Sequence, residues 1–358
     1  MFTRSIMSLA FSTEKQVAIS AVRRACSLTA SVFNRLVKSE TSTKDDKSPV
    51  TVADYSAQAV ISTMLAHAFP ADSIVGEEDS SDLRAESGSD LRSRVIELAN
   101  EALTADLALG DNAEWGIGPG QAKSPEQLLD AIDRGNFAGG RHGRMWTIDP
   151  IDGTKGFLRG EQYAVCVSLI VDAQVQLGVI GCPNLPVDPS KPDGDKGSLF
   201  VAVRGQGAHQ MTLSGADPAP LTIPTFSLDE LNLLESVESA HASHSFHDNV
   251  ASNLGLTKPP TRMDSQAKYC ALARGDGGVY IRMLTNSSYR EKIWDHAPGV
   301  VLVEEAGGVI SDFRGQPLDF GAGRTLGENL GILATGKKVY PSVLEAVKKV
   351  LSEQKSNV

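Results

Sequence analysis

The pattern of hydrophobic and polar positions predicts helices toward both ends of the chain and strands in its middle. Apolar residues recur at helical spacing over residues 14–37 and again in the segment that follows Asp54. Apolar runs of strand length follow in the centre of the chain, at 163–171, 175–182, 199–203 and 207–212. Short apolar runs and helical segments then alternate to the C-terminus. This mixed order favours a layered α+β or α/β architecture over one doubly wound sheet.

Three prolines between Pro218 and Pro224 mark the boundary that we expect between two subdomains. Residues 13–220 are predicted to form an N-terminal α+β subdomain, and residues 221–358 a C-terminal α/β subdomain. Residues 1–12 are predicted to be an N-terminal extension that is frayed or disordered. This extension contains one basic residue, Arg4, which is weak support for organellar targeting.

Two carboxylates follow an apolar, strand-like run at 145–148. Asp149 and Asp152 are three residues apart, with Pro150 restricting the backbone and Gly153 permitting a sharp bend. Two acids held this close repel each other unless a cation lies between them, and Mg²⁺ is typically bound by a few carboxylates with water and phosphate oxygens. The sequence therefore predicts a cation-binding turn, although an ordinary Asp-rich β-turn gives the same local pattern.

Further acids lie at the ends of other predicted elements. A short apolar run ends at Glu77 and Glu78, two adjacent acids between which the local sequence does not choose. Asp54 is predicted near the start of an amphipathic helix, and Asp295 at the start of an apolar one. An Asp in either position is also explained as a helix cap, so the local sequence leaves both interpretations open.

In order and spacing, these segments resemble the signatures of the inositol-monophosphatase-like, Mg²⁺-dependent, lithium-sensitive phosphatases. The resemblance extends over about residues 14–350 and rests on Asp54, Gly-Glu-Glu at 76–78, Asp-Pro-Ile-Asp-Gly-Thr at 149–154, and Trp-Asp at 294–295 with Glu-Ala-Gly-Gly at 305–308. It implies a five-layer αβαβα sandwich of the inositol monophosphatase and fructose-1,6-bisphosphatase type, with a metal site at the seam between two subdomains.

Five other segments resemble the 3′(2′),5′-bisphosphate nucleotidases of plants and fungi; they are 47–54, 153–160, 235–241, 264–269 and 289–296. Those enzymes remove the 3′-phosphate of adenosine 3′,5′-bisphosphate, leaving AMP, and many also act on the sulfated nucleotide, 3′-phosphoadenylyl sulfate. The resemblance implies a phosphoric monoester hydrolase of sulfur assimilation that uses metal-activated water. It further implies two or three Mg²⁺ ions per site and inhibition by Li⁺.

Carried over residue by residue, the resemblance implies a metal site made by Glu77, Asp149, Asp152, Asp295 and the backbone carbonyl of Ile151. It implies that Asp54 and Thr154 orient and deprotonate the attacking water. The implied nucleotide contacts are Thr154, His241, Ser265, Lys268, Arg282 and Asp295. For the basic and polar members of this set, the local sequence also allows a solvated loop histidine, helix-capping residues and a solvent-facing arginine.

Composition restricts the partners. A formal net charge of −10 argues against a surface that coats nucleic acid, which would need a basic stripe. No apolar run approaches the roughly 20 residues that span a bilayer. The four cysteines are widely scattered, without metal-ligand spacing, which is typical of reduced thiols in a cytoplasmic compartment. We expect a small-molecule nucleotide bisphosphate as substrate, no nucleic-acid or membrane partner, and a monomer or weak dimer.

Two alternatives remain at this stage. One is an inositol mono- or polyphosphate 1-phosphatase, which would use the same metal site but need no basic subsite for a second phosphate. The other is an inactive relative that binds the nucleotide and acts as a regulator. The presence of every carboxylate of the implied metal site counts against the second alternative.

Overall fold

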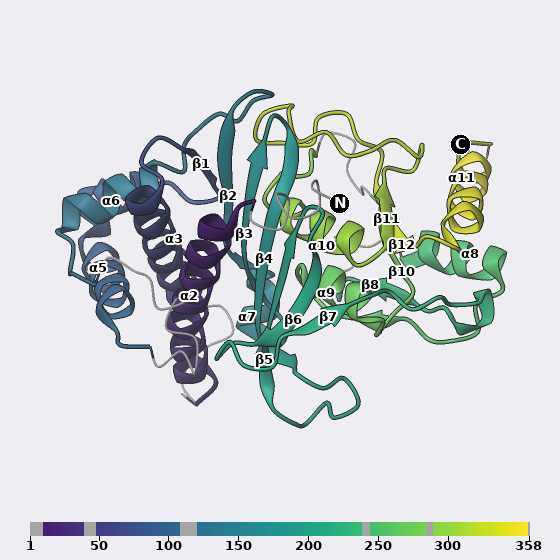
Figure 1. Ribbon diagram of the computed structural model, residues 1–358, viewed down its shortest axis with the longest axis horizontal. Helices are drawn as coiled ribbons and strands as arrows, with labels where there is room; N and C mark the ends of the chain where they lie inside the picture. Colours follow the sequence, from purple (N-terminus) through teal and green to yellow (C-terminus); the bar gives the residue numbers. More distant parts are fainter. Residues whose placement is uncertain (1–9, 39–47, 108–119, 238–243, 284–288, 357–358) are drawn as a thin grey trace, which may run out of the picture.

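The computed structural model describes residues 10–38, 48–107, 120–237, 244–283 and 289–356. Within these ranges, helices and two sheets alternate in five layers, which are seen edge-on in Figure 1. The five-layer αβαβα arrangement implied by the sequence resemblance is therefore confirmed. None of the described helices combines the length and the apolar character needed to cross a membrane.

The larger sheet has seven strands in the order in which they occur along the chain. β1 and β2 are parallel, and every later neighbouring pair is antiparallel. The strands are β1 (Ser73–Gly76), β2 (Arg144–Asp152), β3 (Ala164–Val171), β4 (Gln174–Pro186), β5 (Lys196–Val203), β6 (Gly207–Thr212) and β7 (Ala219–Leu221). The alternating runs predicted at 163–212 correspond to β3 through β6.

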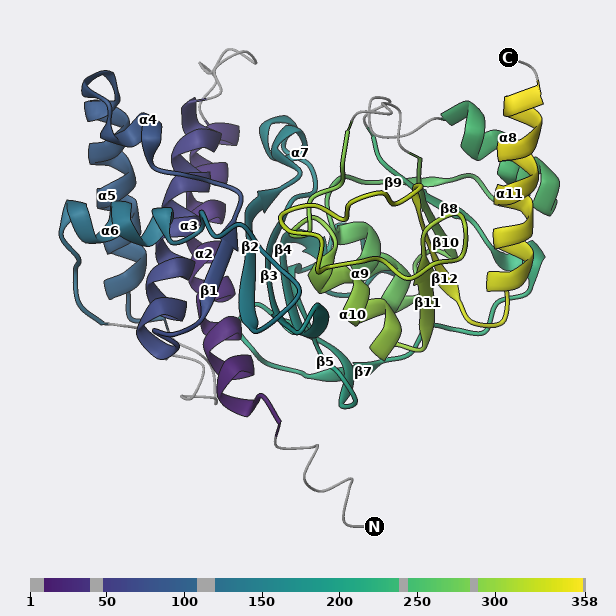
Figure 2. The ribbon, with the colours of Figure 1, turned by 90° about the horizontal axis from the view of Figure 1, so that it is seen from above.

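Two long helices cover one face of this sheet, and shorter helices lie outside them (Figure 2). The long helices are α2 (Ser12–Lys38) and α3 (Ser48–Ala68), and the outer ones are α5 (Ser89–Thr104) and α6 (Pro125–Asp133). Ser124 caps α6 by accepting a hydrogen bond from the Gln127 amide, while the Gln127 side chain accepts one from the Ser124 amide. Short helical segments follow β1 at α4 (Ser81–Arg84) and η1 (Glu86–Gly88), and follow β2 at α7 (Thr154–Arg159).

The opposite face of the larger sheet packs against α9 (Ala267–Arg274) and α10 (Ala297–Glu305). Residues 297–303 of α10 are all buried, because the helix lies between two sheets rather than at the surface. Gly299 permits the close approach of α10 to α9, since a Cβ atom there would lie 2.2 Å from the ring of Tyr269. The two central helices thus form one tightly packed layer.

The second sheet has the strand order β11-β12-β10-β8-β9. Its strands are β8 (Leu233–Glu235), β9 (Thr261–Arg262), β10 (Val279–Arg282), β11 (Gly308–Ser311) and β12 (Ile332–Gly336). The short η3 (Leu228–Glu230) precedes it, and α8 (His244–Leu254) and α11 (Tyr340–Ser356) cover its outer face (Figure 1).

The predicted boundary at residues 220–221 falls at the end of β7, the last strand of the larger sheet. The assignment of 13–220 and 221–358 as separate subdomains remains a prediction. The proposed extension at 1–12 lies mostly outside the described residues, and α2 begins at Ser12.

Candidate metal and phosphate site

A cavity of about 310 Å³ lies between the two sheets. Most of the side chains predicted to form the site line it: Glu77, Asp149, Ile151, Asp152, Thr154, Ser265, Lys268, Arg282 and Asp295. They come from the ends of β1, β2 and β10 and from the segments that lead into α7, α9 and α10. His241 and Lys47 lie outside the described residues, so the contact predicted for His241 has no structural description.

A β-bulge brings Asp149 and Asp152 to the same cavity. Asp149 pairs with Cys166 of β3, whereas Asp152 pairs with Ala164, so three residues of β2 oppose two of β3. In a regular strand, residues three apart point to opposite faces, and the extra residue cancels this alternation. The prediction that the two carboxylates lie in a tight turn is therefore wrong, because both lie within β2. The chain turns only at Gly153, whose φ is +90°.

Asp54 lies beside this cavity rather than in its lining. The helix that carries it begins at Ser48, so Asp54 occupies the second turn and the helix-cap interpretation is wrong. Asp54 is 7% exposed, and its Oδ1 atom has no hydrogen-bond partner among the described residues. Burial and the nearby carboxylates of Glu77 and Glu78 raise the pKa of Asp54 well above its usual value. Asp295 is not a cap either, because α10 begins at Ala297 after His296.

Gln58, one helical turn after Asp54, fixes the backbone next to Glu77. Its side-chain amide donates to the carbonyl of Glu78 and accepts from the Glu78 amide at 2.9 Å. The same amide nitrogen donates to the carbonyl of Ile132 at 3.2 Å. The cavity lining distinguishes the two adjacent acids, since Glu77 lines the cavity and Glu78 does not.

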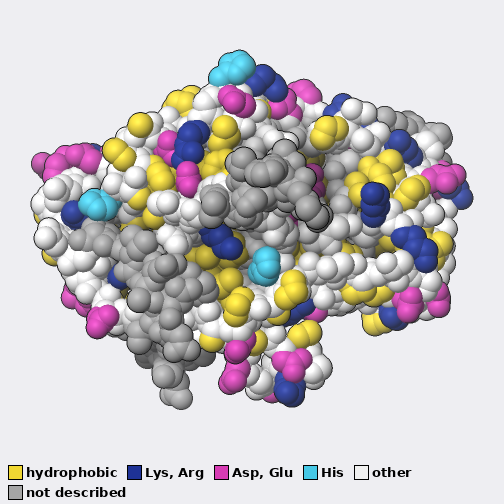
Figure 3. Space-filling view, in the orientation of Figure 1, with side chains coloured by type: hydrophobic (Ala, Val, Ile, Leu, Met, Phe, Trp, Pro, Cys, Tyr) yellow, Lys and Arg dark blue, Asp and Glu magenta, His cyan; other side chains and the backbone are white. Residues whose placement is uncertain are grey.

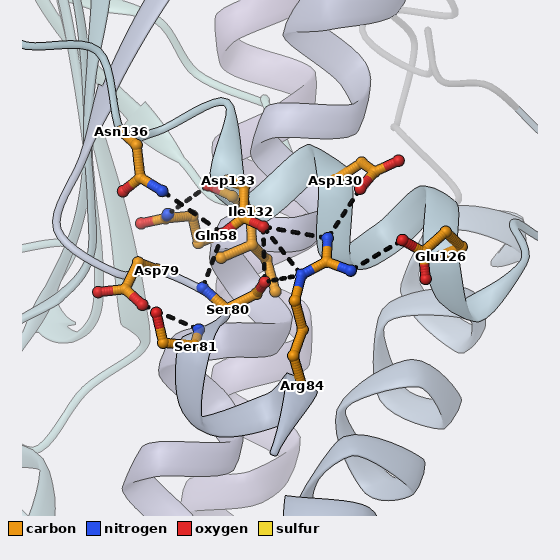
Figure 4. Close-up of polar contacts among 10 residues, drawn as sticks. All are labelled: Gln58, Asp79, Ser80, Ser81, Arg84, Glu126, Asp130, Ile132, Asp133 and Asn136. Carbon is orange, nitrogen blue, oxygen red and sulfur yellow. Dashed lines mark hydrogen bonds and ion pairs between the residues drawn. The ribbon is translucent and has the colours of Figure 1, made fainter.

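The segment after Glu78 is fixed from the surface by a polar network (Figure 4). Asp133 of α6 accepts hydrogen bonds from the amide and the hydroxyl of Ser80, at 2.9 and 2.7 Å. Arg84 forms ion pairs with Asp133 and with Glu126 and Asp130. The outer helices thereby support the acidic loop that leaves β1.

Neighbouring carboxylates raise the pKa of two acids in the cavity, Asp149 and Asp295. Burial, together with Glu77, Asp152 and Asp295, raises the pKa of Asp149 well above its usual value. Burial and the carboxylate of Asp152 do the same for Asp295. The side chain of Asp149 is 2% exposed, and its Oδ1 atom has no hydrogen-bond partner among the described residues. A buried carboxylate without a donor is costly to ionise, and a bound cation would offset that cost.

The cations Lys268 and Arg282 line the same cavity. Lys268 is 2% exposed and donates to the carbonyl of Met263 at 3.1 Å. Burial lowers its pKa to about 8, against the opposing effect of Asp152. Arg282 ends β10 and lines the cavity, so the solvent-facing interpretation is wrong.

Arg282 belongs to a buried chain of polar side chains. Its Nε donates to Glu291 at 2.6 Å, and the other carboxylate oxygen of Glu291 is 3.0 Å from Nε2 of His296. Nδ1 of His296 lies 2.8 Å from the hydroxyl of Tyr269. Although burial opposes ionisation of Glu291, Arg282 and His296 lower its pKa to about 2. These bonds fix the guanidinium at the cavity wall.

The backbone before α9 closes the cavity beside β2. The amide of Gln266 donates to Oδ2 of Asp152, and a Cβ atom at Gly153 would lie 3.0 Å from Ser265. Ser265 has a φ of +65°, unusual for a residue other than glycine, and its hydroxyl accepts from the amide of Ala267 at 3.1 Å. Ser265 therefore accepts from the first amide of α9 but is not its N-cap residue, which is Gln266; Ser265 also lines the cavity.

Residues 12–352 match the inositol monophosphatase family. The chain belongs to this family. A 3′(2′),5′-bisphosphate nucleotidase of Schizosaccharomyces pombe is 48% identical to it over 353 residues, covering 96% of this chain and 98% of the relative. One from Oryza sativa is 42% identical over 356 residues, covering 96% of each. The resemblance inferred from the sequence motifs is confirmed.

Solved structures of the family share the fold at low sequence identity. CysQ from Bacteroides thetaiotaomicron, described as a bacterial member of the family, superposes with a TM-score of 0.58 at 19% identity, covering 92% of this chain and 99% of that one. The inositol monophosphatase from Anabaena gives a TM-score of 0.56 at 20% identity, covering 94% and 96%. At this identity the likeness establishes the fold alone.

Inositol monophosphatase family members are metal-dependent phosphatases that generally use Mg²⁺. The cavity fits such an ion, because its donors are carboxylate oxygens and one of them, Asp149 Oδ1, is buried without a donor. A second group of possible ligand atoms is formed by Glu291, Asp295 and His296. Its Glu291 and His296 atoms are already bonded to Arg282, Tyr269 and each other, so the group fits a cation less well.

Several cavity residues received no role from the sequence alone: Lys155, Ser236, Asp264, Gln266, Tyr269, Tyr280, Tyr289 and His296. Of these, Lys155 had the clearest signal in the sequence, since it is a basic residue directly after Thr154. Tyr269, Tyr280 and His296 have the character of ordinary core residues in the sequence. Only the packing of α9, β10 and α10 around one cavity reveals them.

Replacing Asp149 by asparagine should stabilise the metal-free protein. The neutral amide would relieve the repulsion among the carboxylates, and we expect the free energy of unfolding at pH 7.5 in EDTA to rise by roughly 1 kcal/mol. Chemical denaturation measures this change.

Asp312→Asn is the matched control. Asp312 is also buried, but it accepts hydrogen bonds from the amides of Arg314 and Gln316 and from the Arg314 side chain. Neutralising it should lower the free energy of unfolding by about 1–3 kcal/mol. Equal destabilisation by the two variants would show that the carboxylates of the cavity are not in net repulsion.

Proposed function

We propose that the protein is a 3′(2′),5′-bisphosphate nucleotidase that hydrolyses the 3′-phosphate of adenosine 3′,5′-bisphosphate to AMP and phosphate, with Mg²⁺ as its cofactor. The observation that carries the proposal is that one cavity is lined both by carboxylates and by the cations Lys268 and Arg282. Relatives from fungi and plants named as such nucleotidases, 39–48% identical over nearly the whole chain, support it.

The carboxylates of the cavity suit the reacting phosphate. Glu77, Asp149, Asp152, Asp295 and the carbonyl of Ile151 would hold the metal ions, which when bound supply a hydroxide nucleophile and neutralise the phosphate oxygens. Phosphoryl transfer needs an in-line nucleophile and charge stabilisation more than covalent chemistry by the protein.

Asp54 and Thr154 are proposed to handle the attacking water. The raised pKa of Asp54 makes this carboxyl a better proton acceptor than an exposed aspartate, and its free Oδ1 can accept a hydrogen bond. Thr154 is exposed to the cavity at the first position of α7, and its hydroxyl is 3.4 Å from the carbonyl of Ile151. Its role is to orient the water beside that carbonyl.

The cations of the cavity suit the second phosphate. Lys268 and Arg282 are proposed to bind the 5′-phosphate, while Ser265 and His241 contact the nucleoside, with Thr154 and Asp295 completing the binding site. An inositol monophosphate has no second phosphate with which Lys268 and Arg282 could interact. A regulator without activity would not need the uncompensated carboxylates of Asp149 and its neighbours.

The finer properties of the cofactor and substrate are also proposals. Two or three Mg²⁺ ions per site are expected, with inhibition by Li⁺, which would take the place of one Mg²⁺ and supply only a single charge. 3′-Phosphoadenylyl sulfate is a second expected substrate, because its sulfate extends from the phosphate that Lys268 and Arg282 would bind.

The direct test is phosphate release from adenosine 3′,5′-bisphosphate and from inositol 1-phosphate, side by side, with Mg²⁺ and with EDTA. We expect fast, EDTA-sensitive release from the nucleotide and slow release from the inositol phosphate. Preference for the inositol phosphate would overturn the nucleotide subsite, and absence of release from both would overturn the enzymatic proposal.

Replacing Arg282 should separate the two phosphates. Arg282→Ala is expected to raise KM for adenosine 3′,5′-bisphosphate by about 10- to 100-fold, because a charged hydrogen-bond donor to the second phosphate is lost. KM for adenosine 3′-monophosphate, which lacks that phosphate, should change much less. Steady-state kinetics on both substrates measure the difference.

Arg204→Ala is the control, since Arg204 pairs with Glu304 at 2.7 Å and does not line the cavity. It should leave both KM values unchanged. Arg282→Lys keeps a partner for the buried Glu291 and serves if the alanine variant unfolds. Equal increases on the two substrates would remove Arg282 from the second-phosphate site.

A further inference from the structure

The segment that joins β11 to β12 leaves the second sheet and runs back toward the first (Figure 1). Arg324 lies in this segment. Its side chain donates to the carbonyl of Gly76, the residue before Glu77, and its backbone carbonyl accepts from Ile293, two residues before Asp295. We infer that Arg324 is a positioning residue that fixes the separation of Glu77 and Asp295 across the seam, and so sets the affinity of the site for its metal. The inference rests on the proposed metal site.

On the Glu77 side, the guanidinium bonds to three backbone carbonyls. Nη1 donates to Gly135 at 2.7 Å and to Phe137 at 3.1 Å, and Nη2 donates to Gly76, the residue before Glu77. The segment that contains Gly135 already pairs with β1, since the amide of Gly76 donates to its carbonyl at 2.9 Å. Arg324 thus joins the end of β1 and its neighbouring segment into one unit.

On the Asp295 side, the same guanidinium lies over an aromatic ring. Its central carbon is 4.8 Å from the ring centroid of Trp294, which is 4% exposed and directly precedes Asp295. A guanidinium over an indole face is an attractive arrangement, and the contact limits the movement of the segment that carries Asp295.

The backbone around Arg324 pairs with this segment as well. The carbonyl of Arg324 accepts from the amide of Ile293 at 3.2 Å, and the amide of Leu326 donates to the carbonyl of Glu291 at 2.8 Å. Thr325 and Lys292 form an antiparallel bridge between these two bonds. The backbone at 324–326 is therefore fixed to the backbone at 291–293, and the Arg324 side chain extends from there to the end of β1 in the other sheet.

Such a link matters because strand pairing positions only part of the site. The parallel register of β1 with β2 places Gly76 opposite Ile148 and so positions Glu77 relative to Asp149. Asp295 belongs to the chain before α10, outside both sheets. An arginine suits the link, since its planar fork reaches several carbonyls at once and stacks on a ring, whereas a lysine offers one compact charge.

The alternative is that Arg324 merely stabilises the fold, and Arg24 provides the matched control. Nη1 of Arg24 also donates to backbone carbonyls, those of Ala102, Leu103 and Ala105 at the end of α5, and Arg24 does not line the metal cavity. Arg24→Met and Arg324→Met both keep the apolar stem and remove the donors. Both variants should therefore lower the thermal stability of the metal-free protein.

Calorimetric titration of Mg²⁺ into the metal-free, full-length proteins tests the inference without turnover. Arg324→Met should weaken Mg²⁺ binding by about 10- to 100-fold, the size of effect seen when an outer support of a metal ligand is removed. Arg24→Met should bind Mg²⁺ as the wild type does. In kinetics at saturating Mg²⁺, Arg324→Met should keep the wild-type KM for the nucleotide.

Wild-type Mg²⁺ affinity in Arg324→Met, or an equal loss in Arg24→Met, would overturn the inference while leaving the proposed function intact. If Arg324→Met does not fold, Arg324→Lys replaces it, and wild-type affinity in that variant would overturn the inference as well. Absence of Mg²⁺ binding by the wild type would overturn both the metal site and the positioning role.

Discussion

Repulsion between carboxylates at the seam of two sheets is the constraint on which the rest of this structure depends. Asp149 and Asp295 face the carboxylates of Glu77 and Asp152 in one cavity, and burial makes their ionised forms costly. Holding such groups together in their ionised forms lowers the stability of the fold unless a positive charge offsets their repulsion. The metal-free protein therefore keeps a site whose favourable energy is realised only when a cation binds.

Different structural features hold the acids of the cavity in place against this repulsion. The bulge in β2 directs Asp149 and Asp152 to the same side, and Gln58 fixes the backbone of the Glu77 segment from the helix that carries Asp54. Glu291 and His296 fix Arg282 in the same cavity through a buried chain of hydrogen bonds. Lys268 and Arg282 offset part of the charge of Asp152, and Arg282 part of that of Asp295. Acidic and basic side chains are also mixed on the surface shown in Figure 3.

The sequence was sufficient for the regular elements and for most of the residues around the cavity. The helical period at 14–37 predicted α2, and the apolar runs after residue 162 predicted β3 to β6, because these patterns reflect burial on one or both faces. The short strands β7 and β9 were missed, since two or three residues, one of them Pro220, carry no periodicity.

Non-local pairing explains what could not be predicted. The β2 bulge depends on the register of β2 with β3. Asp54 lies inside its helix because the helix begins at Ser48, before the amphipathic spacing that follows Asp54. The distinction between Glu77 and Glu78 rests on which side chain lines a cavity built from distant segments, and the contacts of Arg324 also join residues far apart in the chain. No local motif encodes such contacts.

The most direct test of the metal site is a crystal structure of the protein with Mn²⁺ in place of Mg²⁺, with the ions located by anomalous diffraction. The expected result is anomalous density bounded by the carboxylates of Glu77, Asp149, Asp152 and Asp295, with the carbonyl of Ile151 as a further ligand. Density confined to the group formed by Glu291, Asp295 and His296, or absent from the cavity at saturating Mn²⁺, would contradict the central claim that these carboxylates are held together for a divalent cation.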